Sequence, residues 1–236
     1  MKKGFPFPMN YTESVVGWVY TFVHTFALGY VVVLMNLYLF PLMGFSLSSS
    51  HLNLLYYGIS FVFLLCFLHK YMRSSFGDML SHKMDTLTSV VLCYVAYIVA
   101  MNIVSYGLGF FLDDLTNPNT AAVNAEAKLN PNTMIVIAVL LAPIVEEVLF
   151  RGVVFGTTRK TNRILAYAVS AIFFAIYHLW DYMLSGFSWD LVLYLFQYIP
   201  AGLILCWCYE RSKNIWGPVF LHMLINYVSI RITVGY

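Results

Sequence analysis

The sequence predicts an all-α, polytopic membrane protein with about seven transmembrane helices, and three observations predict it. Of its 236 residues, 61% are hydrophobic and only 10% are charged, whereas a soluble domain carries about 25% charged residues. Apolar runs long enough to span a bilayer recur along the chain. Lys and Arg gather in alternate connecting loops, as the positive-inside rule requires of a multi-pass protein. We therefore interpret residues 1–236 as one integral membrane domain.

Seven segments meet or approach the length of roughly 20 apolar residues that a spanning helix needs. In chain order they are residues 15–40, 52–68, 87–112, 134–155, 164–184, 191–209 and 216–234. The alternative count adds an eighth, kinked or re-entrant piece near residues 79–86. Pro143 and Pro200 fall within spans, where we expect each to bend its helix or to free a backbone carbonyl. The polar segment 113–133 is rich in Pro and Asn, which predicts turns.

The basic residues predict the orientation of the chain. Ten of the 13 Lys and Arg precede the first span or follow an even-numbered one, namely Lys2, Lys3, Lys70, Arg73, Lys83, Arg159, Lys160, Arg163, Arg211 and Lys213. Lys128 alone lies in the alternate loops, while Arg151 and Arg231 lie within spans. This asymmetry predicts a cell-membrane protein with a cytosolic N-terminus. The net charge of +2 is too small to indicate a nucleic-acid partner, and the composition requires a lipid bilayer.

Polar residues within the spans are the candidate functional residues, because ionisable groups are rare there and usually face a protein interior or a water-filled cavity. They are Glu146, Glu147 and Arg151 in the fourth span, His178 in the fifth, and His222 and Asn226 in the seventh. His24 in the first span is a further polar residue, and it has no evident helical partner.

Helix geometry predicts how these side chains are directed. Glu147 and Arg151 are four residues apart, so they share a helix face and can pair. Glu146 is rotated by about 100° from Glu147 and therefore points elsewhere. His222 and Asn226 also share one face. At about 1.5 Å per residue, the depths of the three spans overlap in the inner half of the bilayer. This overlap predicts a common polar cavity that is reachable from the cytosol.

Each feature also has a plainer explanation when it is taken alone. A Glu–Arg pair between helices is a common packing contact, and a single His near a helix end is more often part of a structural hydrogen bond than a ligand. A His and an Asn on one face can simply bond a neighbouring helix. Packing alone is a weaker explanation for the whole set, because it lies on three different spans.

Together the polar residues suit amide hydrolysis without a protein nucleophile. We expect Glu146, assisted by His178, to activate a water molecule. We expect His222 and Asn226 to stabilise the oxyanion that develops on the attacked carbonyl.

The sequence contains neither the H-E-x-x-H zinc motif nor the G-x-S-x-G serine motif, and no cofactor is expected. Zinc is the alternative, because Glu146, His178 and His222 could supply three metal ligands.

Three short segments resemble the motifs of a known family. Residues 146–151 (EEVLFR) match E-E-x-x-x-R, residues 174–178 (FAIYH) match F-x-x-x-H, and residues 222–226 (HMLIN) match H-x-x-x-N. In this order they resemble the CAAX protease and bacteriocin-processing enzyme family, also called the CPBP or Abi family. The resemblance covers about residues 143–226, and it places a motif-bearing core at about 134–234. The first three spans carry no recognisable motif.

The resemblance implies a glutamate-dependent intramembrane endopeptidase with a CAAX-protease-like helical core that cleaves near the cytosolic face. It gives the Glu, His and Asn residues the roles described above, with Glu147 and Arg151 as supporting residues and with Phe174 packed below His178. Members with eight helices have one span more than this chain. Small members are typical of bacteria, where the family implies peptide substrates such as bacteriocin or pheromone precursors.

A second hypothesis is a membrane scaffold or regulator that binds a partner without cleaving it. The resemblance implies this alternative too, with a sensor kinase, a transporter or a bacteriocin-immunity system as the partner. The intact set of motif residues favours chemistry, because a scaffold has no reason to keep buried charges at their desolvation cost.

Overall fold

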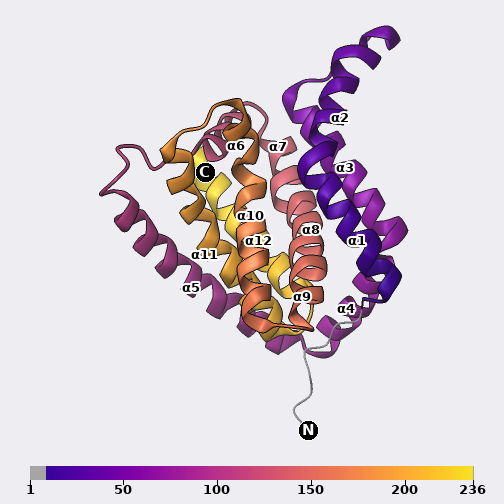
Figure 1. The fold of residues 1–236 in the computed structure, drawn as a ribbon, viewed down its shortest axis with the longest axis vertical. Helices are drawn as coiled ribbons and strands as arrows, with labels where there is room; N and C mark the ends of the chain where they lie inside the picture. Colours follow the sequence, from indigo (N-terminus) through magenta and orange to yellow (C-terminus); the bar gives the residue numbers. More distant parts are fainter. Residues whose placement is uncertain (1–8, 236) are drawn as a thin grey trace.

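The computed structural model describes residues 9–235, and within them every regular element is a helix and there is no strand. Seven helices are long and apolar enough to cross a membrane, which confirms the predicted all-α polytopic fold. Lys2 and Lys3 lie outside the described residues. Figure 1 shows the helices running roughly along the long axis of the molecule.

The first half of the chain contributes three spans and two short helices. The first span joins α1 (Tyr11–Val23), η1 (His24–Leu28), α2 (Gly29–Leu34) and η2 (Met35–Leu39), and a short 3₁₀ turn, η3 (Pro41–Met43), follows it. The second and third spans are α3 (Ser49–Phe67) and α5 (Lys83–Leu108), with α4 (His69–Ser81) between them. After α5 comes α6 (Pro118–Leu129).

The second half of the chain contributes four spans. The fourth span joins α7 (Pro131–Met134), η4 (Ile135–Leu141), α8 (Ala142–Glu146), η5 (Glu147–Phe155) and α9 (Gly156–Arg159). The remaining spans are α10 (Arg163–Ser185), α11 (Trp189–Ser212) and α12 (Trp216–Val234).

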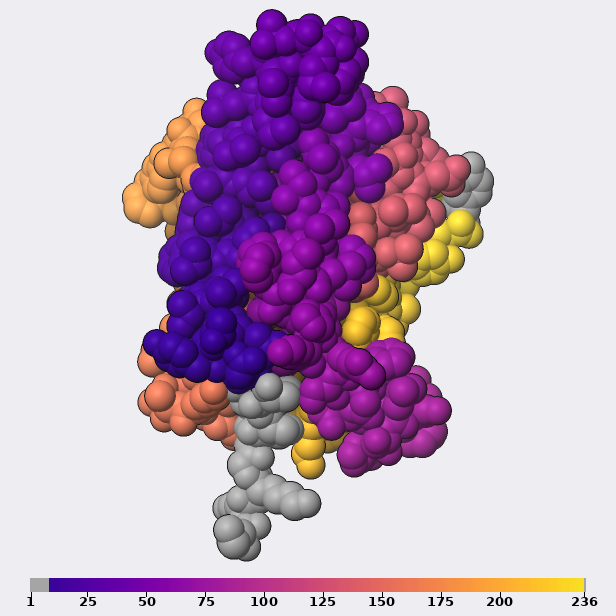
Figure 2. Space-filling view, turned by 90° about the vertical axis from the view of Figure 1, so that its right-hand side faces the viewer, coloured from indigo at the N-terminus to yellow at the C-terminus, as the bar shows by residue number. Residues whose placement is uncertain are grey.

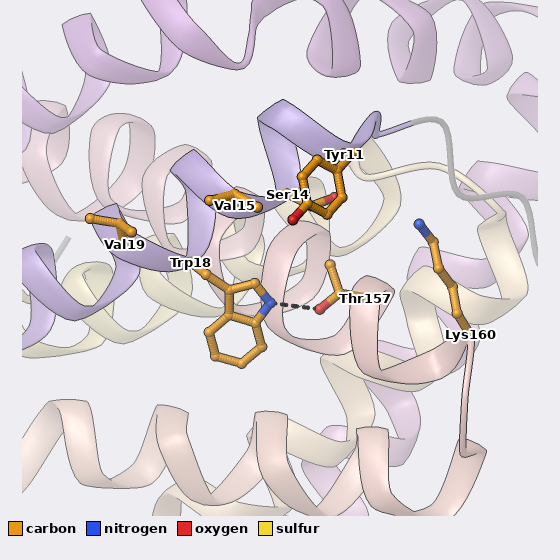
Figure 3. A pocket seen from close by; sticks show the side chains of 7 residues that line it. All are labelled: Tyr11, Ser14, Val15, Trp18, Val19, Thr157 and Lys160. Atoms are coloured by element: carbon orange, nitrogen blue, oxygen red, sulfur yellow. Dashed lines mark hydrogen bonds between the residues drawn. The ribbon is translucent and has the colours of Figure 1, made fainter.

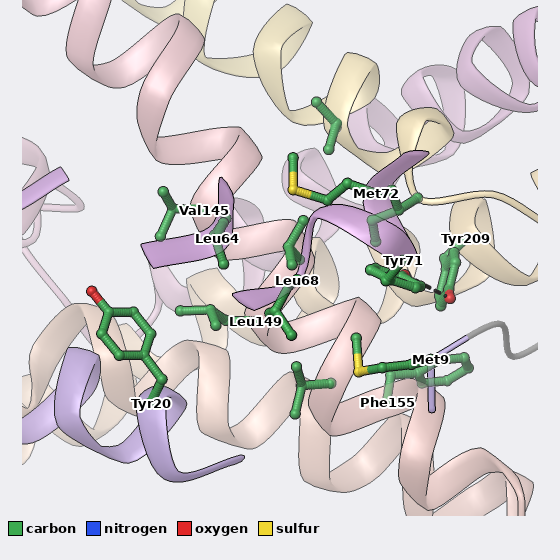
Figure 4. Close-up of a cluster of buried hydrophobic side chains, with 14 of the residues drawn as sticks. Met9, Tyr20, Leu64, Leu68, Tyr71, Met72, Val145, Leu149, Phe155 and Tyr209 are labelled. Atoms are coloured by element: carbon green, nitrogen blue, oxygen red, sulfur yellow. Dashed lines mark hydrogen bonds between the residues drawn. The ribbon is translucent and has the colours of Figure 1, made fainter. Parts of the chain in front are cut away.

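The fourth span is the central element of the bundle. Buried residues make up 61% of its most apolar stretch, against 17–33% in the other spans. A hydrophobic cluster packs one side of it against α1, α3, α4 and α11, as Figure 4 shows for Val145, Leu149 and Phe155. The other spans expose large apolar side chains, such as Val62 and Ile103, on their outer faces. This distribution suits a bundle surrounded by lipid.

The first spans cover one face of the bundle. In Figure 2 the segments from α1 to α3 lie side by side across that face. A buried carboxylate joins α1 to α4: Glu13 forms a capping box with Asn10 at the start of α1 and also accepts a hydrogen bond from the backbone N–H of Tyr71, at 3.1 Å. The N-terminal end of the first span is therefore attached to the short helix that precedes the third.

Two connecting segments bear on the predictions: one decides the number of spans, and the other contains a helix where turns were predicted. The region near residues 79–86 holds no eighth span: α4 ends at Ser81, and α5 starts at Lys83 after a turn at His82. The segment 113–133, predicted as turns, contains the helix α6. Asn117 caps α6 by accepting from the backbone N–H of Thr120, and Pro118 follows in its first turn. Asn followed by Pro is a helix-start signal as well as a turn signal.

Candidate active site

The fourth span departs from regular α-helical geometry at the motif. η4 and η5 are π-helical, and the backbone N–H of Ala142 reaches the carbonyl of Ile137 across five residues. By the same five-residue step, Pro143 would bond the carbonyl of Ala138, but proline has no N–H. The side-chain amide of Asn226 donates to that carbonyl instead, at 2.7 Å. The prediction that Pro143 frees a carbonyl is thus consistent with the structure, and an Asn of the third motif occupies the freed acceptor.

Glu147 is the most heavily bonded carboxylate of the site. Its Oε1 atom accepts from Arg151 Nη1 at 2.9 Å, and neither side chain is exposed to solvent. This confirms the predicted pairing. Arg151 also donates from Nη2 to the backbone carbonyl of Gly202, at 3.3 Å, and lies 4.2 Å above the ring of Phe174. α11 and α10 therefore help to hold the guanidinium in place.

His222 lies between the two glutamates. Its Nδ1 atom is 2.8 Å from Oε1 of Glu147, and its Nε2 atom is 3.9 Å from Oε2 of Glu146. A carboxylate that is also paired with Arg151 accepts hydrogen bonds only, so Nδ1 carries the proton that bonds Glu147. Nε2 is therefore the ring atom directed at Glu146. A separation of 3.9 Å exceeds a hydrogen bond, and it leaves the two groups as neighbours without direct bonding.

Glu146 is held by a residue that lies outside every motif. Its Oε1 atom accepts from the hydroxyl of Tyr57 on α3 at 2.8 Å. Its Oε2 atom is buried and has no hydrogen-bond partner within residues 9–235. One oxygen of Glu146 is thus fixed, while the other is unbonded and directed at His222.

His178 and the residues of the third motif line a cavity of about 170 Å³. Nδ1 of His178 lies 2.8 Å from the carbonyl of Phe174, one helical turn earlier, so it donates there and leaves Nε2 as an acceptor. The rings of His178 and Phe174 meet edge to face at 4.5 Å, as predicted for Phe174. Phe174, His222 and Asn226 line the same cavity. Glu146 does not line it and is reached past His222.

The cavity lies nearer the end of the bundle opposite the basic loops than the sequence predicted. Asn117 and Thr120, from the segment between the third and fourth spans, are among its lining residues. Figure 1 shows α6 and α7 at the opposite end of the molecule from α4 and α9. The fourth helix continues to Arg159 rather than ending at Phe155. At about 1.5 Å per residue, Glu146 therefore lies about 20 Å from that end instead of about 14 Å.

A second and larger hollow contains no motif residue. It measures about 480 Å³ and lies between α1 and the end of the fourth span. Figure 3 shows Trp18 donating to the hydroxyl of Thr157 within it, at 2.9 Å, with Lys160 at its edge. It has none of the acid–base groups of the motif cavity.

The structure brings together most of the predicted site residues and adds two tyrosines. Glu146, Glu147, Arg151 and His222 form one connected cluster, whereas His178 and Asn226 reach it through the shared cavity. The hydroxyl of Tyr57 also lies 2.9 Å from that of Tyr177, which precedes His178 in the second motif. A Tyr in the middle of a span needs a hydrogen-bond partner for its hydroxyl. This requirement could have identified both tyrosines as candidate site residues from the sequence.

His24 lies in a hydrogen-bonded group beside these tyrosines. It is almost fully buried, and its ring nitrogens lie 2.9 Å from Ser60 Oγ and 3.1 Å from Tyr56 Oη. Within residues 9–235, no group of three or more His, Cys, Asp and Glu side chains is arranged to hold a metal ion.

Comparison with known proteins finds relatives of the part of the chain that carries these motifs. The family model described as type II CAAX prenyl endopeptidase Rce1-like matches residues 128–228, which include all three motifs. A candidate membrane peptidase, YdiL of Bacillus subtilis, is 34% identical over 94 residues, covering 39% of this chain and 34% of its own. The membrane-embedded CAAX protease MroQ of Staphylococcus aureus is 30% identical over 117 residues, covering 47% of this chain and 42% of its own.

A further relative is the UPF0177 protein YaiF of Lactococcus lactis, which is 28% identical over 140 residues, or 58% of this chain and 57% of its own. The chain thus spans between about a third and three fifths of the length of these relatives. No solved structure matches the chain.

The fold and the polar cluster define a multi-pass helical membrane protein with a buried glutamate–histidine site. Through residues 128–228 the chain is similar to the type II CAAX prenyl endopeptidases, and its relatives include proteins named as a candidate membrane peptidase and a CAAX protease.

Proposed function

We propose that the protein is an intramembrane endopeptidase that hydrolyses peptide bonds with a water molecule activated by Glu146. One observation carries the proposal. Oε2 of Glu146 is buried and unbonded within the described chain, and it faces His222, whose other nitrogen is held by Glu147. A free carboxylate oxygen beside an oriented imidazole is the arrangement that general-base catalysis requires.

In the proposed mechanism, Glu146 removes a proton from a water molecule that enters beside Oε2 and His222 Nε2. The resulting hydroxide attacks the carbonyl carbon of the scissile peptide bond. Asn226 uses one amide hydrogen on the carbonyl of Ala138 and retains the second for the oxyanion. Glu146 then returns its proton to the leaving amine, and this completes the hydrolysis.

The two histidines have different roles in this proposal. Nε2 of His178 is an acceptor, because Nδ1 donates to Phe174, so His178 orients the attacking water. His222 donates from Nδ1 to Glu147, and when it carries both ring protons, Nε2 donates to the oxyanion. Arg151 balances the charge of Glu147, which would otherwise be buried without a counter-ion.

The proposed substrates are peptides or protein termini that enter the membrane, such as bacteriocin or pheromone precursors. YdiL is named as a candidate membrane peptidase and MroQ as a CAAX protease, which supports this class. If the basic loops face the cytosol, the cavity borders the external half of the membrane, and we propose cleavage there rather than near the cytosolic face.

The test compares wild-type protein with Glu146→Gln and, as a matched carboxylate control, Asp190→Asn on the exposed start of α11. Each variant is expressed in cells that lack the protein, and new protein N-termini in the membrane fraction are enriched and sequenced. Purified protein in detergent is then given quenched-fluorophore peptides that span those sites, with and without a strong zinc chelator.

We expect wild type and Asp190→Asn to cleave and Glu146→Gln to lose at least about 10²–10⁴-fold in rate, the usual contribution of a general base. Unimpaired cleavage by Glu146→Gln would contradict the mechanism. Loss of wild-type cleavage with the chelator would indicate instead that Glu146, His178 and His222 bind a metal ion. Absence of cleavage by every variant, with the protein correctly inserted, would favour a scaffold that binds a sensor kinase, a transporter or an immunity partner.

A further inference from the structure

A chain of buried and partly buried hydroxyl and imidazole groups leads away from Oε1 of Glu146, the oxygen that does not face His222. It starts at Tyr57, whose hydroxyl bonds Glu146 at 2.8 Å and lies 2.9 Å from the hydroxyl of Tyr177. Tyr177 in turn lies 3.4 Å from the hydroxyl of Tyr56, which contacts His24. None of these groups takes part in the mechanism above.

The protons of this chain can be assigned from its far end. The hydroxyl of Ser60 donates its single proton to the backbone carbonyl of Tyr56, at 3.0 Å. Ser60 must therefore accept from its other neighbours, the hydroxyl of Tyr20 at 3.0 Å and Nδ1 of His24 at 2.9 Å. His24 thus carries its proton on Nδ1, and Nε2 is left as an acceptor for Tyr56.

The same reasoning fixes the near end. The hydroxyl of Tyr56 donates to the carbonyl of His24, at 2.8 Å, or to its ring Nε2, at 3.1 Å. Tyr177 therefore has the oxygen of Tyr57 as its well-placed acceptor, at 2.9 Å. Tyr57 then has only one acceptor for its own proton, namely Oε1 of Glu146. The whole chain directs the hydroxyl of Tyr57 toward the carboxylate.

Packing prevents Tyr57 from turning away. The rings of Tyr56 and Tyr57 meet edge to face at 4.9 Å, and the ring of His24 stacks on Tyr56 at 4.7 Å and on Tyr177 at 5.4 Å. The donors come from α3, α10 and the π-helical turn of the first span. Three spans therefore cooperate in holding one hydroxyl group against Glu146.

We propose that Tyr57 is the positioning residue that determines which oxygen of Glu146 takes the proton from water. By bonding Oε1, it leaves Oε2 as the only oxygen available to a water molecule beside His222. This role rests on the proposed function, since it concerns the geometry of the base in that reaction. Tyr57 acts through Glu146 and is not among the residues that line the motif cavity.

The test uses Tyr57→Phe, which removes one hydroxyl and keeps the ring. The matched control is Tyr209→Phe, since the hydroxyls of Tyr71 and Tyr209 also form a pair inside the protein, at 2.9 Å, in the cluster shown in Figure 4. Tyr177→Phe is the third variant, because it removes the support of Tyr57 but keeps the bond between Tyr57 and Glu146.

Two measurements are made on each variant. The first is an infrared difference spectrum against Glu146→Gln, which isolates the carboxyl band of Glu146 whether or not a substrate is known. The second is the kinetics of peptide cleavage, with kcat and KM determined separately. A positioning role is expected to lower kcat about tenfold to a hundredfold with little change in KM, because misplacing a catalytic group affects the reaction step rather than binding.

We expect Tyr57→Phe to shift the Glu146 band and to lower kcat, Tyr177→Phe to have a smaller effect on both, and Tyr209→Phe to have none. If the infrared carboxyl band of Glu146 is unchanged in Tyr57→Phe, the hydrogen bond between Tyr57 and Glu146 is disproved. A shifted band with an unchanged kcat would overturn the positioning role, and so would an equal loss in Tyr177→Phe. Absence of cleavage by wild type would instead overturn the proposed function, while the infrared band still decides whether Tyr57 orients Glu146.

Discussion

At the scale of single residues, one carboxylate oxygen accepts hydrogen bonds from two side chains of the site. Oε1 of Glu147 accepts from both Arg151 and His222, at 2.9 and 2.8 Å. The buried Glu147–Arg151 pair is neutral as a unit, whereas Glu146 is bonded by the hydroxyl of Tyr57. A buried pair of this kind is costly to break, because the remaining charge has no water to solvate it.

This argument predicts unequal consequences for two arginine substitutions. Arg151→Met leaves Glu147 buried without its counter-ion, and we expect a loss of about 3–5 kcal/mol in unfolding free energy. Arg163→Met removes a mostly exposed partner of Glu210, which retains Arg159 at 2.7 Å, so we expect little change. Thermal and denaturant unfolding of both variants in the same detergent measures the difference. Equal stabilities would show that Glu147 does not depend on Arg151.

At the scale of helices, the site depends on the close approach of α10 and α11. A Cβ atom on Gly202 would lie 2.9 Å from the Cα of Ala171, so only glycine allows this separation. The carbonyl of Gly202 also accepts from Arg151. Side chains from neighbouring helices likewise bond carbonyls of the π-helical fourth span, since Ser170 donates to the carbonyl of Phe150 at 2.9 Å.

We predict opposite effects for the same substitution in two helices. Gly202→Ala pushes α11 away from α10 and is expected to destabilise the protein by about 1–3 kcal/mol, as overpacking does, and to reduce cleavage. Gly58→Ala in α3 meets no atom within 4 Å, and it is expected to be neutral or stabilising by about 0.5–1 kcal/mol. Unfolding midpoints in detergent measure both. A stabilising Gly202→Ala would show that the two helices can separate freely.

The sequence predicted those features that depend on local periodicity. The seven spans and the Glu147–Arg151 pair follow from apolar length and from the four-residue spacing. The helix α6 was missed because an Asn-Pro start is also a turn signal, and the role of Tyr57 was missed because its contact with Glu146 joins residues 89 positions apart. The depth of the cavity was misjudged, because it depends on where the fourth helix ends and on π-helical turns that composition does not reveal.

At the scale of the whole molecule, the motif cavity and the basic loops lie toward opposite ends of the bundle. The charge pattern predicts that the ends of α9 and α4 face the cytosol, and α6 then faces outward. In this arrangement the motif cavity is approached from the external half of the membrane, past Asn117 and Thr120.

Labelling of single cysteines tests this orientation. Cys66 is exposed and is first replaced by Ser, whereas the other three cysteines are buried. Cysteine is then placed at Asp113, in the segment before α6, or at Thr161, between α9 and α10; both positions are exposed. With a membrane-impermeant maleimide on intact cells, we expect Asp113→Cys to react and Thr161→Cys to react only after permeabilisation. The reverse pattern would place the cavity in the cytosolic half.

The π-helical turns of the fourth span have a consequence for how this chain can vary in length. A π-helical turn holds one residue more than an α-helical turn, so the direction of every later side chain depends on that surplus. Deleting a single residue within Ile135–Leu141 would turn Glu146 and Glu147 by about 100° relative to the preceding residues. We therefore expect natural variants of η4 to tolerate substitutions more readily than insertions or deletions.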